Sequence, residues 1–332
     1  MRIGPVDTDR QVAIIAEIGN NHEGDLATAR ELVRAAAGAG AHAVKLQAIE
    51  PAELVGPEDT ARLAQLRHFQ LTAEQFAELA ALAHSLGIGF VCTPFSLGAV
   101  DWLEPLVDAF KVASGDNDYL ALLERIGATG RPTIVSAGMT GVQGLARARR
   151  ALLGAGGGEF AALHCVSAYP TPPEAARLAT IPVLARDLDA TIGYSDHTIG
   201  VQACLAAVAL GARILEKHFT LRHDFSDYRD HQLSSEPAEL EELVRRVAEV
   251  ELLRGEPREV DVLPEEVAVA ATARRSAVAA RDLPEGHVLG AGDVQFLRPA
   301  GPIGPADPVV GRVLRRPRRA GERLQAGDVE WH

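Results

Sequence analysis

Lysine is rare in this chain, and its few positions indicate sites where arginine cannot take its place. Of the 33 Lys and Arg residues among 332, only Lys45, Lys111 and Lys217 are lysines. A lysine carries a compact ammonium charge, whereas arginine carries a broad, planar guanidinium group. Lysines kept in an arginine-rich chain therefore point to places where a compact positive charge is needed.

Lys45 and Lys111 lie in apolar segments and have polar neighbours suited to an anion. The residues with hydroxyl or amide groups near the ends of such segments are Gln47, Thr93, Ser114, Ser136, Ser167 and Ser195. Ammonium charges combined with directed hydrogen-bond donors are what a phosphate-bearing anion requires. Two alternatives stay open from the residues alone. One lysine could form a Schiff base in an aldolase, or the lysines could form structural ion pairs with Glu17 or Asp116.

Two histidines end neighbouring apolar segments and could share a divalent cation. His197 and His218 would supply two imidazole ligands, while carboxylates and substrate oxygens complete the coordination shell. The chain contains neither an HxxxH nor an HExxH motif. Lys217 alternates out of phase with Glu216 and His218, so we expect it to face the surrounding helices and to pair with an acid of the last helix.

These polar residues follow eight short apolar segments that predict buried parallel strands. The segments span 12–19, 43–47, 88–92, 109–114, 132–138, 161–167, 190–196 and 213–219. Helical patterns such as 27–40 and 72–87, with Thr at the start and Gly at the end, lie between them. Eight strand–helix units in series predict an α/β fold, a closed (β/α)8 TIM barrel, in preference to an open doubly wound sheet. In such a barrel the chemistry lies at the carboxyl ends of the strands.

The pattern changes after a last long helix predicted over 236–255. We expect a barrel domain over 1–255, a Pro- and Glu-bearing linker over 256–273, and a separate domain over 274–332. The tail contains an internal repeat at an offset of 35 residues, in which AGDV at 291–294 recurs at 326–329. Two related short units predict a small, pseudo-symmetric, β-rich domain.

Charge and composition limit the possible functions. The tail holds 10 Arg and 7 acidic residues, whereas the rest of the chain holds 23 basic and 38 acidic residues. These opposite net charges could favour docking of one part of the chain onto the other. With 47% hydrophobic residues, the chain has enough apolar material for a core. No segment approaches 18 apolar residues, so no membrane span is expected, and the net charge of −12 argues against nucleic acid as a partner. Three scattered cysteines fit the reducing cytoplasm.

Nine motifs, in order along the chain, resemble the sialic acid synthase family. They are AEIGNNHEG (16–24), VKLQ (44–47), TPFS (93–96), KVASGD (111–116), SAGM (136–139), HCVSAYPTP (164–172), IGYSDHT (192–198), EKHFT (216–220) and RDHQLSSEP (229–237). The tail segment 274–299 resembles that family's antifreeze-like (SAF) C-terminal domain. The resemblance implies a transferase that condenses phosphoenolpyruvate with an N-acetylmannosamine-type sugar, releasing phosphate and a nine-carbon 3-deoxy-2-keto acid.

The resemblance also implies roles for individual residues. It assigns phosphoenolpyruvate binding to Lys45, Gln47, Thr93, Lys111, Ser114, Ser136, Ser167 and Ser195. It places a divalent metal, usually manganese, with magnesium or cobalt as alternatives, on His197 and His218. The catalytic acidic positions fall on Glu17 and Asp116.

For the acceptor, an N-acyl hexosamine, the matching positions are Tyr169, Asp230 and Arg298. Arg298 matches an arginine that reaches the acceptor's N-acyl group from the other subunit. A domain-swapped homodimer is therefore expected, in which each tail covers the barrel of its partner.

Some residues depart from the family pattern. Asp116 stands where many members have Glu, Ser167 where some bacterial members have Asn, and Ala48 where Thr is common. The segment between His218 and Asp230 is short compared with some bacterial members. The shorter Asp116 side chain bears on catalysis, and the other departures bear on which acceptor is used, since related synthases make legionaminic or pseudaminic acids or use a 6-phosphorylated sugar.

Two other functions remain as alternatives. A Schiff-base aldolase or lyase on the same barrel would use Lys45 or Lys111 as its nucleophile. A non-catalytic protein that binds sugar acids would keep the binding residues, and the departure at Asp116 is the one feature that favours it.

Overall fold

The chain folds into two compact units, Met1–Gly255 and Glu256–His332. The computed structural model describes residues 1–255, 259 and 261–331. The predicted linker over 256–273 thus includes four residues, 256–258 and 260, that lie outside the described residues.

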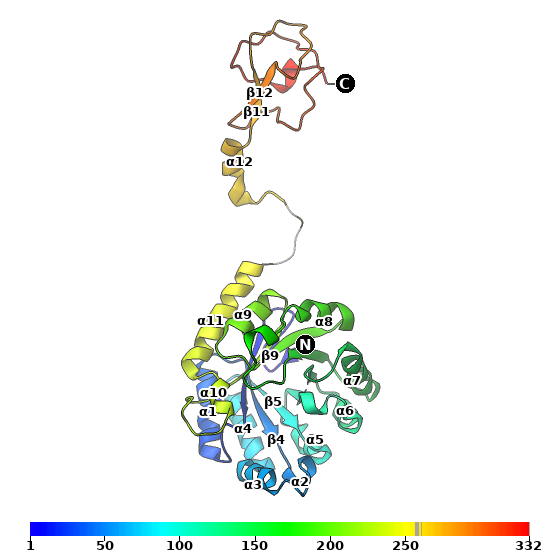
Figure 1. Cartoon of the computed structure of the whole chain (residues 1–332), viewed down its shortest axis with the longest axis vertical. Coiled ribbons are helices and arrows are strands. Elements are labelled where there is room, and N and C mark those ends of the chain that lie inside the picture. The colour runs from blue at the N-terminus through cyan, green and yellow to red at the C-terminus, as the bar shows by residue number, and fades with distance from the viewer. Residues whose placement is uncertain (256–258, 260, 332) are drawn as a thin grey trace. The chain divides into compact units, whose positions relative to one another are not determined.

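The first unit is a closed barrel of eight parallel strands, as predicted (Figure 1). Each of the eight expected apolar segments forms one strand. The strands are β3 (Ala13–Gly19), β4 (Ala43–Ala48), β5 (Gly89–Pro94), β6 (Ala109–Val112), β7 (Thr133–Ser136), β8 (Phe160–Cys165), β9 (Thr191–Asp196) and β10 (Ile214–His218). Closure occurs because β10 pairs with β3 in parallel register, with Ile214 beside Ala13 and His218 beside Glu17.

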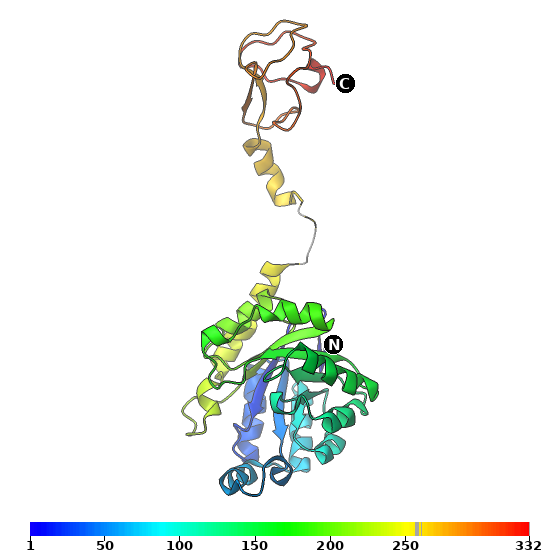
Figure 2. The same cartoon turned by 45° about the vertical axis from the view of Figure 1, so that its right-hand side comes forward.

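Helices surround the barrel and cover the outer faces of the strands (Figure 2). The main helices are α1 (Leu26–Gly38), α4 (Ala73–Ser85), α5 (Leu97–Leu103), α6 (Leu120–Gly127), α7 (Val142–Gly154), α8 (Thr180–Leu188), α9 (Gln202–Ala209) and α11 (Pro237–Arg254). They form the larger hydrophobic core with the outward-facing strand residues, such as Ile14 and Ala16. The helices expected over 27–40, 72–87 and 236–255 are confirmed within two residues.

The barrel interior has an apolar layer toward the amino ends of the strands and a polar layer toward their carboxyl ends. The apolar layer combines the inward-facing residues Ala13, Ile15, Ala43, Val91, Ala109, Ile134, Ala161, Leu163 and Ile214. Inward-facing positions recur every second residue in a strand. The next inward positions of these strands hold Glu17, Lys45, Thr93, Lys111, Ser136, Cys165 and Glu216. The apolar layer therefore supports a polar layer at the carboxyl ends of the strands.

A short N-terminal hairpin, absent from the sequence predictions, closes the end of the barrel at which the strands begin. Strands β1 (Arg2–Ile3) and β2 (Val6–Asp7) pair in antiparallel fashion, and Ile3 and Val6 join the interior core. Gly4 has a φ of +53°, and a Cβ there would lie 2.5 Å from Cα of Gly89. Only glycine permits this approach of the hairpin to β5.

Two connections at the carboxyl ends of the strands are longer than a strand–helix unit requires. The segment between β4 and α4 includes α2 (Pro51–Leu54) and α3 (Thr60–Phe69). The segment after β10 includes α10 (Asp230–Leu233) before α11 begins. Both lie next to the polar layer, because each directly follows a strand that contributes to it.

Lys217 faces the helices, as its alternation predicts, but its expected pairing is wrong. Its Nζ lies 2.9 Å from Oδ2 of Asp196, its direct neighbour on β9, rather than beside an acid of the last helix. Both side chains are fully buried. Asp196 also accepts hydrogen bonds from the Tyr194 hydroxyl at 3.0 Å and the Thr198 amide at 2.8 Å. This buried pair therefore joins β9 to β10 directly beside the two strand-end histidines.

The second unit is small and contains an antiparallel sheet of β11 (Ser276–Ala279) and β12 (Val294–Leu297). Before this sheet it contains α12 (Val267–Ala273), a helix that the sequence patterns did not predict. The sequence repeat corresponds to a repeated local structure. Asp293 accepts a hydrogen bond from the amide of Gly290 at 2.8 Å, and Asp328, 35 positions later, accepts one from Gln325 at 2.6 Å.

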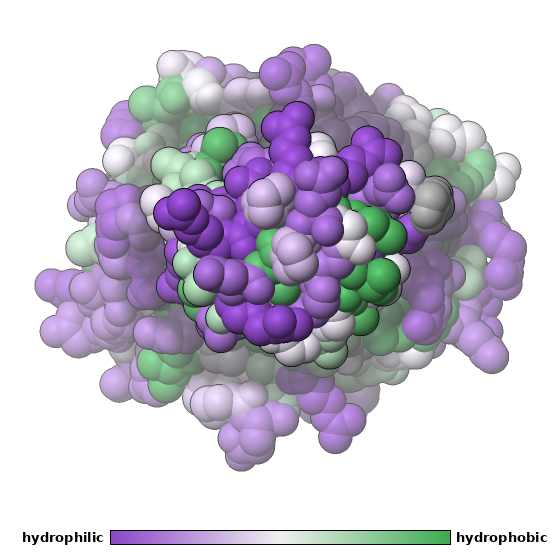
Figure 3. All heavy atoms as spheres, turned by 90° about the horizontal axis from the view of Figure 1, so that it is seen from above, coloured by the Kyte–Doolittle hydropathy of each residue, from purple (hydrophilic) through white to green (hydrophobic). Residues whose placement is uncertain are grey.

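On the face seen in Figure 3, most of the exposed side chains are hydrophilic, and hydrophobic side chains form smaller groups among them. None of the helices in the described part of the chain combines the length and the hydrophobicity that a bilayer-spanning helix requires.

The buried Lys217–Asp196 pair gives a prediction about stability. Lys217→Met leaves the Asp196 carboxylate buried without its counter-charge, and we expect the free energy of unfolding of the first unit to fall by about 3–5 kcal/mol. Urea denaturation of the full chain, followed by circular dichroism, measures this change. Arg186→Met breaks an exposed ion pair with Asp187 and serves as the control, with no measurable change expected. Equal midpoints for Lys217→Met and the wild type would contradict the prediction.

Candidate active site

The polar layer surrounds a cavity of about 210 Å³ at the carboxyl ends of the barrel strands. Eleven of the fifteen residues predicted for the site line it. They are Glu17, Lys45, Gln47, Lys111, Ser114, Ser136, Tyr169, Ser195, His197, His218 and Asp230. Every strand except β5 thus contributes through its end or the loop that follows, and residues far apart in sequence meet in one small volume.

Four buried charges form the centre of this cavity. Lys45 Nζ lies 3.0 Å from Oε1 of Glu17 and 3.6 Å from Oε2 of Glu216. Lys111 Nζ lies 4.0 Å from the same Glu216 oxygen. The Glu216 carboxylate therefore stands between two ammonium groups, and the cluster contains two positive and two negative groups when all are ionised.

This arrangement gives the two carboxyl groups different proton affinities. Burial would raise the pKa of Glu216, but Lys111 and Lys45 outweigh burial and hold its pKa below the ordinary value. Burial raises the pKa of Glu17, and the nearby Glu216 charge adds to the shift, although Lys45 opposes it. Glu216 therefore favours its ionised form, and Glu17 is the carboxyl group of the pair that takes up a proton more readily.

The two lysines of the cluster also differ in the direction of their pKa shifts. Burial acts to lower the pKa of Lys45, but Glu17 and Glu216 overcome burial and raise its pKa. Burial lowers the pKa of Lys111, and the attraction of Glu216 opposes this only in part. A bound anion near Lys111 would add the negative charge that this ammonium group lacks.

Hydroxyl groups and amides fix the orientation of the charged groups. Lys111 donates to Ser136 Oγ at 2.6 Å, and Ser195 donates to Glu216 at 2.9 Å. Lys45 lies 3.4 Å from Thr93 Oγ1, so Thr93 contacts the cluster although it does not line the cavity. Gln47 donates to Glu17 Oε1 at 2.8 Å.

Two further serines face the backbone of Gly138, directly after β7. A Cβ at Gly138 would lie 2.4 Å from the Oγ atoms of both Ser114 and Ser167. Ser167 Oγ is buried and has no hydrogen-bond partner in the described part of the chain. Glycine at position 138 thus lets both serine hydroxyls approach its backbone, and any side chain there would displace them.

The two histidines lie side by side with the Tyr169 ring. The ring centroids of His197 and His218 are 5.4 Å apart, and Tyr169 packs 4.1 Å from His197. His197 Nδ1 lies 2.9 Å from the Val166 carbonyl oxygen, which leaves Nε2 available. Burial lowers the pKa of His218 to about 4, so its imidazole is neutral and can act as a ligand.

These imidazoles fit a divalent cation only in part. Among the described residues, no group of three His, Cys, Asp or Glu side chains is arranged to hold a metal. His218 Nδ1 is buried without a partner in the described part of the chain. Two protein ligands with water and substrate oxygens agree with the open coordination of a catalytic metal.

Asp116 and Arg298 do not line the cavity. Asp116 lies in a 3-10 turn, Ser114–Asp116, where burial raises the pKa of its carboxyl group and Asp118 adds to the shift. Its neighbour Asn117 donates to the carbonyl oxygens of Ser136 and Gly138 at 3.1 and 2.9 Å. Arg298 is an exposed residue of the second unit.

Several residues that line the cavity were not predicted for the site from the sequence. Glu216 is the most important of them, because it contacts both lysines. Its alternation with His218 places both inside the barrel, so the signal was present. Arg62, Tyr228 and Arg229 come from the long connections, and no local pattern predicted their approach.

The sequence profile of the NeuB family matches residues 32–259, and that of the SAF domain matches residues 274–330. The N,N'-diacetyllegionaminic acid synthase of Legionella pneumophila is 34% identical, with 99% of this chain and 97% of that protein aligned. The N-acetylneuraminate-9-phosphate synthase of Homo sapiens is 37% identical over 83% of this chain and 80% of its own.

Solved structures agree with these relatives. The sialic acid synthetase of Leptospira borgpetersenii serovar Hardjo-bovis, determined in complex with citrate, is 31% identical and has a TM-score of 0.76. The aligned region covers 81% of this chain and 94% of that chain. The resemblance inferred from the nine motifs is thereby confirmed: this chain belongs to the NeuB family and carries a SAF domain at its C-terminal end.

Proposed function

We propose that this protein is a nonulosonate synthase, which condenses phosphoenolpyruvate with an N-acyl hexosamine and releases phosphate. The observation that carries the proposal is the pair of buried lysines beside an array of serines at the strand ends. Relatives over nearly the whole chain are named as synthases of legionaminic and pseudaminic acids. Such products form by joining three carbons of phosphoenolpyruvate to a six-carbon sugar.

The charge of the cavity suits phosphoenolpyruvate. Its phosphate and carboxylate groups are anionic, and protonation of Glu17 leaves the four-charge cluster with a net positive charge. Lys45 and Lys111 then balance the bound anion, while Ser114, Ser136 and Ser167 offer directed donors. The lysines act as ammonium groups throughout, which separates this reaction from Schiff-base chemistry.

The reaction needs one proton delivered and one removed. C3 of phosphoenolpyruvate forms a C–C bond to the aldehyde carbon of the open sugar, whose oxygen takes a proton from Glu17. Water then adds to C2 and returns a proton to Glu17. The C2–O bond to phosphate breaks as the C2 hydroxyl passes its proton to the departing phosphate, which leaves the 2-keto group. Glu216 stays ionised and stabilises the positive character that develops at C2.

His197 and His218 would hold a divalent cation, manganese in the first place, with magnesium or cobalt as alternatives. Such an ion acts as a Lewis acid toward the acceptor's aldehyde oxygen. Tyr169 packs against both imidazoles and limits their orientation.

The acceptor would lie above these groups, against Tyr169 and Asp230. Arg229 places its guanidinium 5.1 Å from the Tyr169 ring centroid and pairs with Asp230 at 3.3 Å. Arg298 would complete the site from the partner subunit in a domain-swapped homodimer. We further propose a cytoplasmic location, since the three cysteines are free and buried.

Removing one ammonium group tests the binding of phosphoenolpyruvate. Lys111→Gln leaves Glu216 with a single lysine, and we expect kcat/KM for phosphoenolpyruvate to fall by about 100-fold or more in a phosphate-release assay. Arg125→Gln removes an exposed charge on α6 and should leave it unchanged. Phosphate release without an aldose would contradict the proposal. A mass shift after borohydride with pyruvate would instead identify a Schiff-base enzyme, and sugar binding without turnover a binding protein.

Metal removal tests the two histidines. We expect EDTA to abolish phosphate release and Mn²⁺ to restore it. His218→Gln removes one of two protein ligands and should weaken Mn²⁺ binding, followed by electron paramagnetic resonance, at least about 10-fold. His84→Gln alters a histidine on α4 that pairs with Asp108, and should leave Mn²⁺ binding unchanged. Full activity after exhaustive chelation would exclude the metal.

Mixed dimers test the role of Arg298. Arg298→Ala and Lys111→Ala should each be nearly inactive alone. If Arg298 acts in the partner's site, each hybrid dimer regains one complete site, and an equal mixture after subunit exchange recovers about a quarter of the wild-type activity. A mixture that stays inactive although hybrids are detected by native mass spectrometry would show that Arg298 does not act across subunits.

A further inference from the structure

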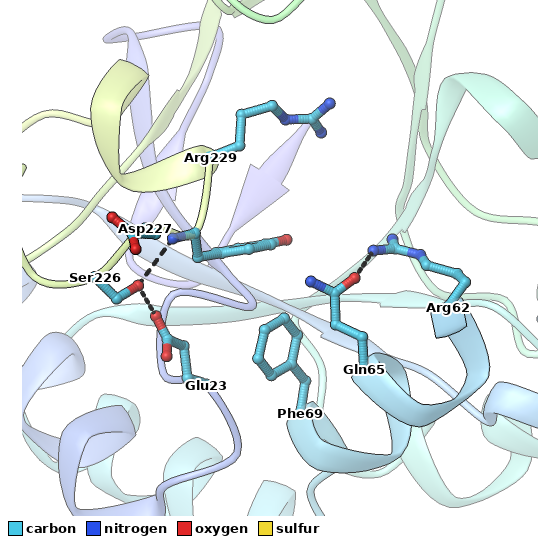
Figure 4. A pocket seen from close by; sticks show the side chains of 8 residues that line it. Glu23, Arg62, Gln65, Phe69, Ser226, Asp227 and Arg229 are labelled. Carbon is cyan, nitrogen blue, oxygen red and sulfur yellow. Dashed lines mark hydrogen bonds between the residues drawn. The ribbon is translucent and has the colours of Figure 1, made fainter. Parts of the chain in front are cut away.

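A second, larger pocket of about 710 Å³ lies between the two long connections of the barrel (Figure 4). Helix α3 contributes Arg62, Gln65 and Phe69, the segment after β10 contributes residues 226–229, and Glu23 follows β3. None of these residues is at a strand end, so the pocket differs in origin from the catalytic cavity. We call it the outer pocket.

The outer pocket adjoins the catalytic cavity. Arg62, Tyr228 and Arg229 line both. Tyr228 is fixed between them, because its ring packs edge-on against Phe69 at 5.0 Å and its hydroxyl donates to Asp230 at 3.2 Å. A sugar whose aldehyde carbon lies at the catalytic end would therefore extend its far end past Tyr228 into the outer pocket.

The outer pocket is divided between hydrogen-bond acceptors and donors. In Figure 4, Glu23, Ser226 and Asp227 gather on one side, and Arg62 with Gln65 lies on the other. Its two arginines and two acids leave the lining without net charge. A group that carries both a carbonyl oxygen and an N–H matches such a division, whereas a phosphate would meet two carboxylates without a surplus of positive charge.

Arg62 is the donor best placed to meet such a group. Its Nη1 donates to the neutral Gln65 side chain at 2.6 Å, whereas the guanidinium of Arg229, the other arginine of the pocket, already pairs with Asp230 at 3.3 Å. Glu23, by contrast, has Oε1 occupied by Ser226 and by His231 Nε2 at 3.0 Å. Phe69 and Tyr228 add an apolar surface that suits a methyl group.

We propose that the outer pocket binds a second N-acyl group on the acceptor, at the end of the sugar remote from its reacting carbon, and that Arg62 donates to the acyl carbonyl oxygen. The inference rests on the proposed synthase reaction and names its acceptor class: a neutral di-N-acylated deoxyhexose in preference to a 6-phosphorylated sugar. Arg62 thereby determines specificity and takes no part in bond making.

The test compares acceptors in the full-length protein. Phosphate release is measured with a 2,4-di-N-acetyl-6-deoxyhexose, with N-acetylmannosamine and with N-acetylmannosamine 6-phosphate. We expect the wild type to favour the di-N-acetyl sugar in kcat/KM. Arg62→Gln should reduce the ratio of kcat/KM for the di-N-acetyl sugar over N-acetylmannosamine by about 10-fold or more, since a charge-assisted hydrogen bond is lost.

Arg67→Gln is the matched control, because Arg67 lies on the same helix but lines neither cavity. It should keep the wild-type ratio. A preference for the 6-phosphate, or an unchanged ratio in Arg62→Gln, would overturn the inference while leaving the synthase reaction in place.

If none of the three sugars supports phosphate release, the proposed reaction fails, and binding decides the inference separately. Isothermal titration calorimetry with the di-N-acetyl sugar and with N-acetylmannosamine needs no turnover. Tighter binding of the first, lost in Arg62→Gln but not in Arg67→Gln, supports the outer pocket as an acyl subsite. Equal affinities overturn it.

Discussion

The Glu216 carboxylate, buried between two ammonium groups, is the interaction on which the rest of the site depends. Two lysines this close inside a barrel would repel each other and lose their charge by burial. Glu216 opposes this loss of charge in both lysines, and Lys45 brings Glu17 into the same cluster. The negative charge of Glu216 in turn raises the proton affinity of Glu17. In the proposed reaction, this one carboxylate thus prepares the site for an anion and makes Glu17 the proton carrier beside it.

The groups proposed for chemistry and those proposed for specificity come from different parts of the barrel. The charged cluster and the histidines lie at strand ends, where an apolar layer below and parallel pairing on both sides fix each side chain. The outer pocket is made by α3 and the segment after β10, which lie outside the repeating strand–helix pattern. Loops tolerate change more readily than strands. Changes in these connections can therefore alter the acceptor while the reaction at the strand ends stays the same. Arg62 lies in one of these connections, where the proposed acceptor specificity would be determined.

Much of the fold and part of the site follow from the sequence. The eight apolar segments predicted the barrel, because strand formation reflects local alternation and burial. Alternation also placed Lys217 outside the barrel. Its partner was predicted wrongly, since Asp196 is its neighbour only through the pairing of β9 with β10. Helix α12 and the N-terminal hairpin were missed because both are short and carry little periodicity.

The sequence by itself determined the strand ends, the lysines and serines on them, and the family to which their order belongs. Only the tertiary structure decided which charge faces which. Glu17 and Glu216 are 199 positions apart, yet barrel closure brings both to Lys45. Arg62 and Tyr228 likewise meet at the outer pocket through two connections with no shared pattern. The physical reason is that periodicity is a property of neighbouring residues, whereas proton affinity and specificity depend on distances set by closure of the barrel.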